Sequence, residues 1–170
     1  MNEQLQKTIQ ALKEKFGCEE NVHRGEHTLF VDARDLLAVV EMLRNEFGFN
    51  LLASLTATDY WPEEAPRMHV SYQFYSIEDK IHLRLRVRLA GDELTLPTIE
   101  GYYPNANWHE REVYDMFGII FEGHSDLRRI LMPYEWEGHP LRKDYPLGYE
   151  EPQFTFNFDT IDLRKPKATE

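Results

Sequence analysis

The sequence predicts an α+β fold in which helices pack on a mostly antiparallel sheet, followed by a short helix and an extended C-terminal arm. In the first 48 residues, two segments repeat apolar residues every three or four positions, the spacing of a helix with one buried face. Residues 49–89 hold three strand-like segments, and after residue 117 the chain loses any period and becomes rich in Gly, Pro, Arg and aromatic residues. Helices that precede a run of consecutive strands are typical of an α+β arrangement.

Two helices and one strand are predicted in the N-terminal part of the chain. The first helix covers residues 3–16 and is stopped by Gly17. A strand follows over residues 27–32, and Asp32 or Asp35 caps the second helix. The apolar faces are formed by Leu5, Ile9, Leu12 and Phe16 in the first helix and by Leu36, Leu37, Val40, Leu43 and Phe47 in the second.

Three consecutive strands are predicted over residues 49–59, 67–75 and 80–89. Residues 77–80 read as a hairpin loop, so the last two strands should be antiparallel neighbours. In the last strand apolar residues alternate with His and Arg, which predicts one buried face and one basic face. The basic face carries Arg84, Arg86 and Arg88. Two interpretations stay open for it: a docking surface for an acidic partner, or a solvated sheet face.

The composition excludes several classes of protein. The chain has 170 residues, 42% of them apolar and 13% aromatic, which is typical of a globular protein. A formal charge of −11 argues against free nucleic acid as a partner. The single cysteine, Cys18, cannot hold an iron–sulfur cluster or a paired-cysteine zinc site. The common phosphate-loop, dinucleotide-binding and hydrolase motifs are absent. No apolar run approaches the ~18 residues that span a bilayer, so we expect a cytoplasmic or membrane-peripheral protein.

A third helix is predicted over residues 108–117. Its predicted structural anchors are Trp108, Arg111, Glu112 and Asp115. Helical spacing places Glu112 on one apolar sector with Trp108, and the other two anchors on a second sector. A buried carboxylate is stable only when it is paired and hydrogen-bonded. Glu112 is therefore expected to be buried and bound by Arg128 or Arg129, which would tie the helix to the arm.

A chemical interpretation of the same helix is the alternative. His109 and Glu112 lie one turn apart, a spacing that metal centres in helical proteins use. Together with His139 they would form the site of a free-standing metalloenzyme. The helix supplies only two ligands, and the rest would have to come from an irregular segment without metal-site spacing. The structural role of Glu112 is therefore favoured over a metal site.

Three blocks of sequence resemble the family of the C-type, thirty-kilodalton-type subunit of bacterial-type NADH-quinone oxidoreductase, respiratory complex I. Residues 108–119 read WHEREVYDMFGI, residues 123–131 GHSDLRRIL and residues 138–146 GHPLRKDYP. The blocks stand in the order of the family and with nearly its spacing, and the N-terminal α+β part agrees in length and element order. The resemblance thus covers essentially the whole chain. Subunits of photosynthetic NDH-type complexes and of membrane-bound hydrogenases are similar too.

The resemblance implies a structural subunit in the peripheral arm of a proton-translocating NADH:quinone oxidoreductase. Such a subunit is not catalytic alone and carries no flavin, metal or iron–sulfur cluster; NADH, quinone, flavin and clusters belong to the complex. It docks on the large subunit that shapes the quinone cavity, on the cytoplasmic side of the cell membrane or of an equivalent energy-converting membrane. An adaptor subunit of a related membrane-bound hydrogenase-type complex stays open as an alternative.

We expect two parts: an α+β globular domain over residues 1–122 and an extended docking segment over residues 123–170. In the docking segment, residues 153–158 alternate aromatic and polar side chains, like a strand that joins a neighbour or folds back on its own sheet. The positions that the resemblance assigns to partner binding are Asp126, Arg128, Arg129, Trp136, His139, Arg142, Lys143, Asp144 and Tyr145. For the first two arginines of this set, an ion pair with a carboxylate of the third helix is an equal alternative.

Overall fold

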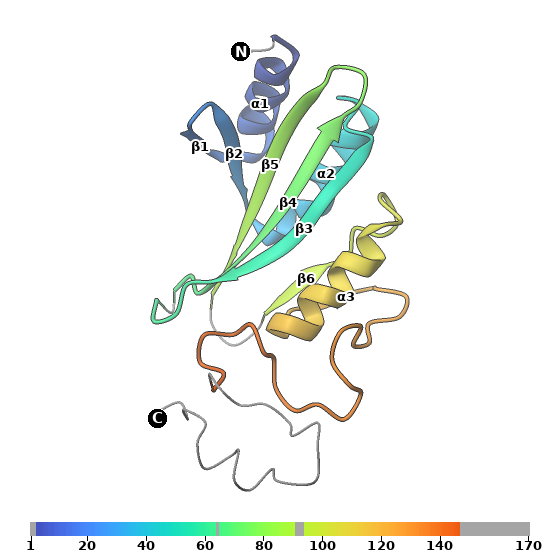
Figure 1. Ribbon diagram of the computed structural model, residues 1–170. Helices are drawn as coiled ribbons and strands as arrows, with labels where there is room; N and C mark the ends of the chain where they lie inside the picture. Colours follow the sequence, from blue (N-terminus) through green and yellow to red (C-terminus); the bar gives the residue numbers. More distant parts are fainter. Residues whose placement is uncertain (1–2, 64, 91–93, 147–170) are drawn as a thin grey trace, which may run out of the picture.

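The computed structural model describes residues 3–63, 65–90 and 94–146 (Figure 1). The predicted strand-like segment 153–158 lies outside these residues. The helices are α1 (Glu3–Phe16), the 3-10 helix η1 (Ala33–Asp35), α2 (Leu36–Asn45) and α3 (Ala106–Phe117). The strands are β1 (Glu19–His23), β2 (Glu26–Val31), β3 (Leu51–Asp59), β4 (Met68–Ser76), β5 (Ile81–Leu89), β6 (Thr95–Pro97) and β7 (Ile120–Glu122).

Five strands form one sheet in the order β1-β2-β5-β4-β3. Neighbouring strands are antiparallel except β2 and β5, which run parallel with Leu29 opposite Leu85. Strands β6 and β7 form a second, small parallel pair. Helix α2 lies behind the large sheet in Figure 1, and α3 runs beside β3, which it contacts. The predicted α+β class with a mostly antiparallel sheet is confirmed.

The hydrophobic core lies between the large sheet and the helices. Strand β5 alternates strictly between buried and partly or fully exposed residues, because successive side chains of a strand point to opposite faces. The predicted division of β5 into a buried and a basic face is therefore confirmed. Tyr103 extends the core toward α3: its hydroxyl donates to the carbonyl of Phe49 at 2.5 Å, and its ring lies 5.2 Å from that of Phe74.

The first two helices bury most of the face that their periodicity predicts. The residues of that face that are buried are Leu5, Ile9, Leu12, Leu36, Val40 and Leu43. Leu37 is exposed, so its place on the predicted apolar face of α2 is wrong. Of the two candidate caps, Asp32 accepts the N–H of Arg34 at 3.0 Å at the start of η1, whereas Asp35 makes no side-chain cap bond.

Three strands escape prediction from the sequence. Four of the five residues of β1 are exposed, so this strand has no alternating pattern to detect. It forms because a turn with positive φ at Arg24 (52°) and Gly25 (83°) folds it back against β2. Strands β6 and β7 have three residues each, too few for any period to be recognised.

Candidate docking site

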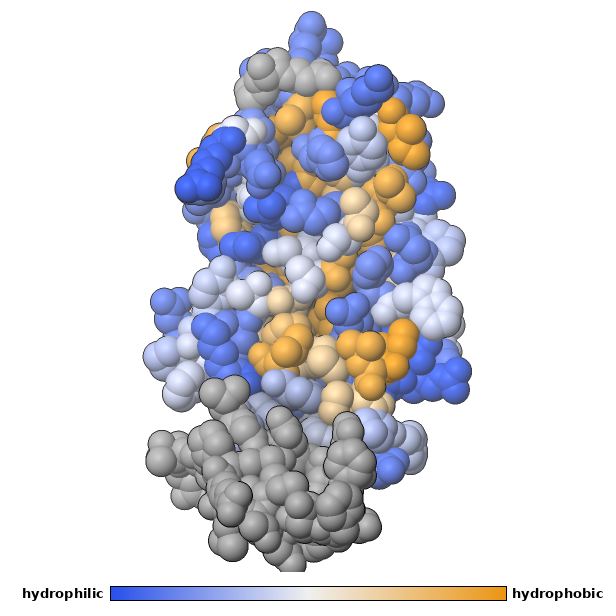
Figure 2. Space-filling model, viewed as in Figure 1, coloured by the Kyte–Doolittle hydropathy of each residue, from blue (hydrophilic) through white to orange (hydrophobic). Residues whose placement is uncertain are grey.

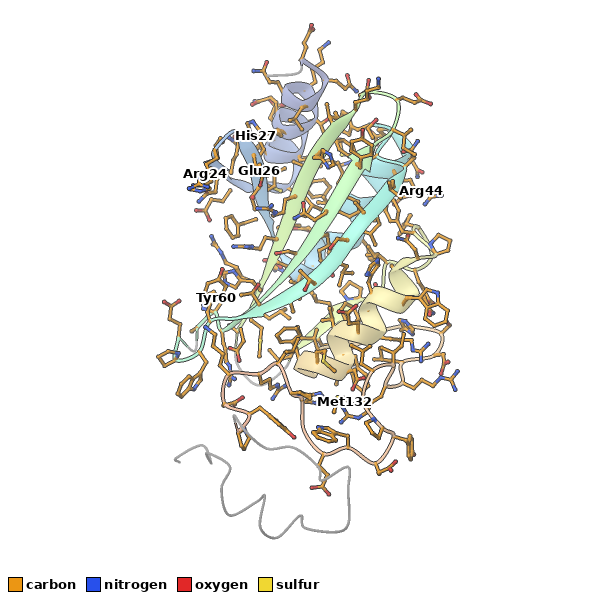
Figure 3. The ribbon with its side chains drawn as sticks, in the orientation of Figure 1. Arg24, Glu26, His27, Arg44, Tyr60 and Met132 are labelled. Atoms are coloured by element: carbon orange, nitrogen blue, oxygen red, sulfur yellow. The ribbon has the colours of Figure 1, made fainter. Side chains whose placement is uncertain are left out.

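Helix α3 and residues 123–146, which we call the arm, form one connected structure. The arm has no helix or strand of its own and follows α3 on the side away from the sheet (Figures 1 and 3). Met132, labelled in Figure 3, lies between the helix and the outer course of the arm and packs against the core. The irregular path predicted from the sequence is thus present in residues 123–146.

The buried carboxylates of α3 are Glu110 and Asp115, not Glu112. The side chains of Glu110 and Asp115 are completely buried, whereas Glu112 is exposed, so its predicted burial and pairing with an arginine are wrong. Trp108, assigned to the same apolar sector, is 60% exposed. The error has a physical cause: α3 is covered by the sheet on one side and the arm on another. A single helical period therefore does not reveal its buried sides.

Asp115 anchors the arm by accepting hydrogen bonds from its backbone. One carboxylate oxygen accepts the N–H groups of Ile130, Leu131 and Met132 at 3.0, 2.8 and 2.9 Å. The other accepts from the guanidinium of Arg129 at 2.7 Å. Burial acts to raise the pKa of Asp115, but the N–H of Met132, the Arg129 guanidinium and the other amides outweigh it and hold the pKa below its ordinary value.

Arg111 holds the arm from the neighbouring turn of α3. Its guanidinium donates to the backbone carbonyls of Arg128 and Arg129 at 3.1 and 3.2 Å and lies 5.2 Å from the ring of Trp108. Arg111 thus binds backbone carbonyls and Asp115 binds backbone amides of the same short segment, residues 128–132. Arg128 directs its own side chain to Asp126 in an exposed ion pair of 2.9 Å.

A second anchor lies at the end of β3. The carboxylate of Asp59 accepts the N–H groups of Trp61 at 2.9 Å and of Lys143 at 2.8 Å. The guanidinium of Arg67 donates to both oxygens of Asp59, at 2.9 and 2.8 Å, and also pairs with Asp144 at 2.9 Å. Burial opposes ionisation of Asp59, yet the Arg67 and amide hydrogen bonds prevail and lower its pKa to about 2. The arm is therefore bound to the sheet as well as to α3.

A third set of contacts secures the C-terminal end of α3. Gly118 ends the helix with φ +75°, a conformation that L side chains rarely adopt. A Cβ there would lie 2.6 Å from the ring of His139 and 2.7 Å from the guanidinium of Arg142. His139 donates from Nδ1 to the carbonyl of Asp115 at 3.0 Å, and Arg142 donates to that of Phe117 at 2.6 Å. Burial and nearby guanidinium groups, Arg142 first, lower the pKa of His139.

The start of the arm rests on a polar cluster beside Glu110. Glu110 accepts the N–H of Ile99 at 2.8 Å and the hydroxyl of Thr98 at 2.5 Å, while burial raises its pKa above the ordinary value. Glu100 accepts the N–H of Ser125 at 2.9 Å. The buried side chain of His124 donates to the carbonyl of Asn107 at 3.1 Å and accepts the N–H of Asp126 at 3.0 Å.

The positions assigned to partner binding thus make contacts inside the chain. Arg129, His139, Arg142 and Asp144 bind Asp115, α3 or Arg67, as described above. The hydroxyl of Tyr145 donates to the carbonyl of Glu137 at 3.4 Å, and Trp136 is half-buried. For Arg129 the ion pair within the chain, with Asp115, is the alternative that the structure contains. A role of these residues toward another subunit stays a prediction.

Three of the side chains that the arm presents outward are large and apolar, among exposed charged ones such as Glu135 and Lys143. Tyr134 is 94% exposed, Leu131 is 62% exposed and Leu141 is exposed by more than half. We call these three residues the arm surface; Trp108 at the start of α3 and Ile120 in β7 are exposed as well. Figure 2 shows hydrophobic residues in the part of the molecule where α3 and the arm lie, and also along the rest of the visible face. Exposed large apolar side chains on a fixed backbone are typical of an interaction surface.

Asp59 and Arg67 belong to the contacts that hold the arm and were not predicted from the sequence. The available signal was weak: Asp59 occupies an inward-facing position at the end of a strand, where a carboxylate requires a partner. Its partner Lys143 is 84 positions away, and no local pattern indicates such a contact.

The structure does not assemble the proposed metal site. Within the described residues, no group of three or more His, Cys, Asp or Glu side chains is placed to hold a metal ion, so His109, Glu112 and His139 do not form one. No helix among the described residues is long and apolar enough to cross a membrane.

Comparison with known proteins identifies related chains along most of this sequence. Residues 29–151 match the family described as respiratory-chain NADH dehydrogenase, 30 Kd subunit. The C-type subunit of NADH-quinone oxidoreductase from Roseiflexus sp. (strain RS-1) is 46% identical over 149 residues, which is 86% of this chain and 85% of the relative. The protein of the same name from Geotalea uraniireducens (strain Rf4) is 47% identical over 139 residues, 80% of this chain and 84% of the relative.

Solved structures agree with these relationships. A trypsin-resistant fragment of Nqo5 is 31% identical, covers 73% of this chain and 99% of its own, and has a TM-score of 0.65. A chain of the membrane-bound sulfane sulfur reductase, an archaeal respiratory membrane complex, covers 93% of this chain and 89% of its own with a TM-score of 0.71. At 24% identity this second likeness concerns the fold alone. The chain therefore belongs to the family of the 30 Kd subunit of respiratory-chain NADH dehydrogenase.

Proposed function

We propose that this chain is a structural subunit in the peripheral arm of a proton-translocating NADH:quinone oxidoreductase. It docks through the arm on the large subunit that shapes the quinone cavity, and it carries no redox centre of its own. It resides on the cytoplasmic side of the cell membrane, or of an equivalent energy-converting membrane, and reaches that membrane through the complex. The observation that carries the proposal is the apolar arm surface on a backbone fixed by Asp115 and Asp59.

The exposed side chains supply the driving force for docking. Covering a large apolar side chain contributes roughly 1.5–3 kcal/mol. The arm surface has three such side chains close together in sequence, Leu131, Tyr134 and Leu141. Tyrosine in particular anchors interfaces because it combines a large apolar ring with a hydrogen-bonding hydroxyl.

The fixed backbone lowers the cost of docking. An irregular segment that becomes ordered only on binding loses conformational entropy at that step. Here the amides of Ile130, Leu131 and Met132 are already held by Asp115, and that of Lys143 by Asp59. The sequence predicts an extended docking segment without helical or strand periodicity. The contacts within the chain support an arm that presents its surface before the neighbour arrives.

Assembly in cells tests the docking surface. Tyr134→Asp and Leu131→Asp place a charge on the surface without removing a backbone contact of the arm. We expect both variants to accumulate as folded chain while the amount of assembled complex falls, because a buried unpaired carboxylate opposes docking. Ile77→Asp is the matched control, since Ile77 is an exposed apolar residue in the β4–β5 turn, far from the arm.

The complex is quantified by affinity purification through another subunit, and turnover is measured per assembled complex. Assembly at the normal level with both arm variants would overturn the proposal. A normal amount of complex with lost quinone reduction would assign the arm to the reaction rather than to docking.

The absence of a redox centre is a separate part of the proposal. The single cysteine, Cys18, supports it because thiolate-bound clusters and paired-cysteine zinc sites need several cysteines. Metal analysis and flavin absorbance of the purified full-length chain test it. Stoichiometric iron, zinc or flavin would contradict this part while leaving the docking surface in place.

A role as adaptor in a related membrane-bound complex is the second candidate. This second candidate is supported by the similarity of fold to a chain of the sulfane sulfur reductase complex, which covers 93% of this chain. Identification of the subunits that co-purify with this chain distinguishes the two. An NADH-oxidising module among them supports the first candidate, and its replacement by another electron-input module supports the second.

A further inference from the structure

The face of the large sheet that is turned away from the helices is polar, aromatic and basic. We call it the open face and define it by Phe30, Tyr60, His69, Tyr75, His82, Arg84, Arg86 and Arg88. Helix α2 lies behind the sheet in Figure 1, so that the strands are seen from the open face, and Tyr60 marks its lower end in Figure 3. None of the described elements packs over the middle of this face. It carries positive charge on a chain whose formal charge is −11.

The outer two arginines of the open face are neutralised within the chain. Arg84 pairs with Glu26 at 2.9 Å, and Arg88 pairs with Glu19 at 3.0 Å. The guanidinium of Arg88 also lies 3.7 Å from the centre of the Phe30 ring. Both arginines thus have the carboxylate that a guanidinium at a protein surface usually finds.

Arg86, between them, has no such carboxylate among the described residues. Its guanidinium donates to two neutral hydroxyls, Ser71 Oγ and Tyr60 Oη, each at 3.3 Å. Ser71 is buried beneath it, and Arg86 itself is half-buried in the sheet surface. Neutral hydroxyls do not cancel the positive charge of a half-buried guanidinium, so this charge still attracts an anion from outside the chain.

His69 adds a second unsatisfied group beside Arg86. Its ring stacks on Tyr60 with 4.5 Å between the centroids, and its Nδ1 is buried without a hydrogen-bond partner among the described residues. Burial and then the charges of Arg86 and Arg88 lower the pKa of His69. An uncompensated guanidinium and an unpaired ring nitrogen therefore lie beside Tyr60, toward the lower end of the open face.

We propose that the open face is a second docking surface, which receives an acidic side chain of another subunit against the guanidinium of Arg86. The inference rests on the proposed function only in that the partner belongs to the same complex; the surface itself is separate from the arm. Charge complementarity selects the partner's chemistry, since a carboxylate satisfies the planar fork of a guanidinium with two hydrogen bonds. Two aromatic rings beside it, that of Phe30 on the neighbouring strand and that of Tyr60, provide the apolar contacts that surround such a pair in an interface.

Hydroxyl-radical footprinting of the purified complex and of the isolated full-length chain tests whether the face is covered. We expect Phe30 and Tyr60, which flank Arg86, to be modified severalfold less in the complex. Leu37, exposed on α2 behind the sheet, serves as the internal reference. Unchanged modification of Phe30 and Tyr60 would overturn the inference. Tyr134 of the arm separates the two proposals in the same sample. If Tyr134 is protected in the complex and the open face is not, docking through the arm is supported and only the proposal for the open face is rejected.

A zero-length cross-link then identifies the partner's chemistry. In the complex with Arg86→Lys, a carbodiimide should join the new amine to an Asp or Glu of another subunit, seen by mass spectrometry. Arg34→Lys is the matched control, because Arg34 is strongly exposed and already paired with Asp32 at 2.8 Å. A link to residues 147–170 of this chain, a link to a second copy, or no link beyond the Arg34→Lys background would each overturn the inference. Protection of the face only when vesicles of anionic phospholipid are added would assign it to a membrane surface instead.

Discussion

Replacing Asp115 by Asn should release the arm from α3 while leaving the sheet folded. The change removes the charge that three backbone amides and Arg129 share, and it keeps the size of the side chain. An amide can still accept at its oxygen, but its NH2 group would face donors. The guanidinium of Arg129, whose side chain is only 16% exposed, would then lack a counter-charge.

The magnitude follows from the geometry. Removing one partner of a buried ion pair costs about 3–5 kcal/mol, and a hydrogen bond to a charged group contributes about 1.5–3 kcal/mol. The four bonds share one acceptor group and are not additive, so the figure for the ion pair, rather than the sum of the four bonds, sets the scale of the whole change. We expect the free energy of opening the arm to fall by about 3–5 kcal/mol, which corresponds to about 10²- to 10⁴-fold faster exchange of its amides.

Hydrogen–deuterium exchange of the isolated full-length chain provides the measurement. The amides of residues 130–132 should lose protection in Asp115→Asn, and those of β4 and β5 should keep theirs. Glu112→Gln is the matched control on the same helix: Glu112 is exposed, so the same loss of charge should change stability by less than about 0.5 kcal/mol. Equal exchange in both variants, or faster exchange in Glu112→Gln, would refute the assignment of Asp115 as the anchor.

Two further predictions concern the other contacts of the arm. The pKa of Asp59 is about 2 in the folded chain against an ordinary 3.8, so its contribution to stability is present above about pH 4 and is lost as the pH falls toward 2. Urea unfolding should show that the free energy of unfolding decreases over this range. Asp59→Asn should make that decrease smaller. An acid slope that Asp59→Asn leaves unchanged would contradict this. Gly118→Ala should lower the free energy of unfolding by about 1–3 kcal/mol, because of the left-handed backbone and the close approach of His139. Gly101→Ala is its control, since a Cβ there meets no atom within 4 Å, and equal losses in the two variants would rule out the close-packing explanation.

Much of the fold could be predicted because its signals are local. Ile81 to Leu89 alternate residue by residue, and the strand indeed buries one side and exposes arginines on the other. The helix over residues 3–16 has the predicted bounds. Strand β1 could not be predicted, because an exposed edge strand without apolar alternation looks like a loop in the sequence.

The candidate site was predicted in its location but not in its contacts. The sequence indicated a helix fastened to an irregular arm, and Arg129 does bind a carboxylate of that helix. It indicated the wrong carboxylate, Glu112, because periodicity assumes one buried side and α3 has two. The hydrogen bond between Asp59 and the amide of Lys143 depends on how the whole chain folds, because the two residues are 84 positions apart. No short segment of the sequence indicates such a contact.

The parallel pairing of β2 with β5 has a consequence for how the chain folds during synthesis. Strands β3, β4 and β5 can pair through short hairpins as each leaves the ribosome, whereas β2 meets its partner only after residue 87 has been made, since Val31 lies opposite Val87. Until then the β1–β2 hairpin has no neighbour in the sheet, and an isolated hairpin is only marginally stable in water. The first strands to be synthesised are therefore among the last to be secured. Substitutions at Thr28 or Phe30 should slow folding less than substitutions of equal cost between β4 and β5.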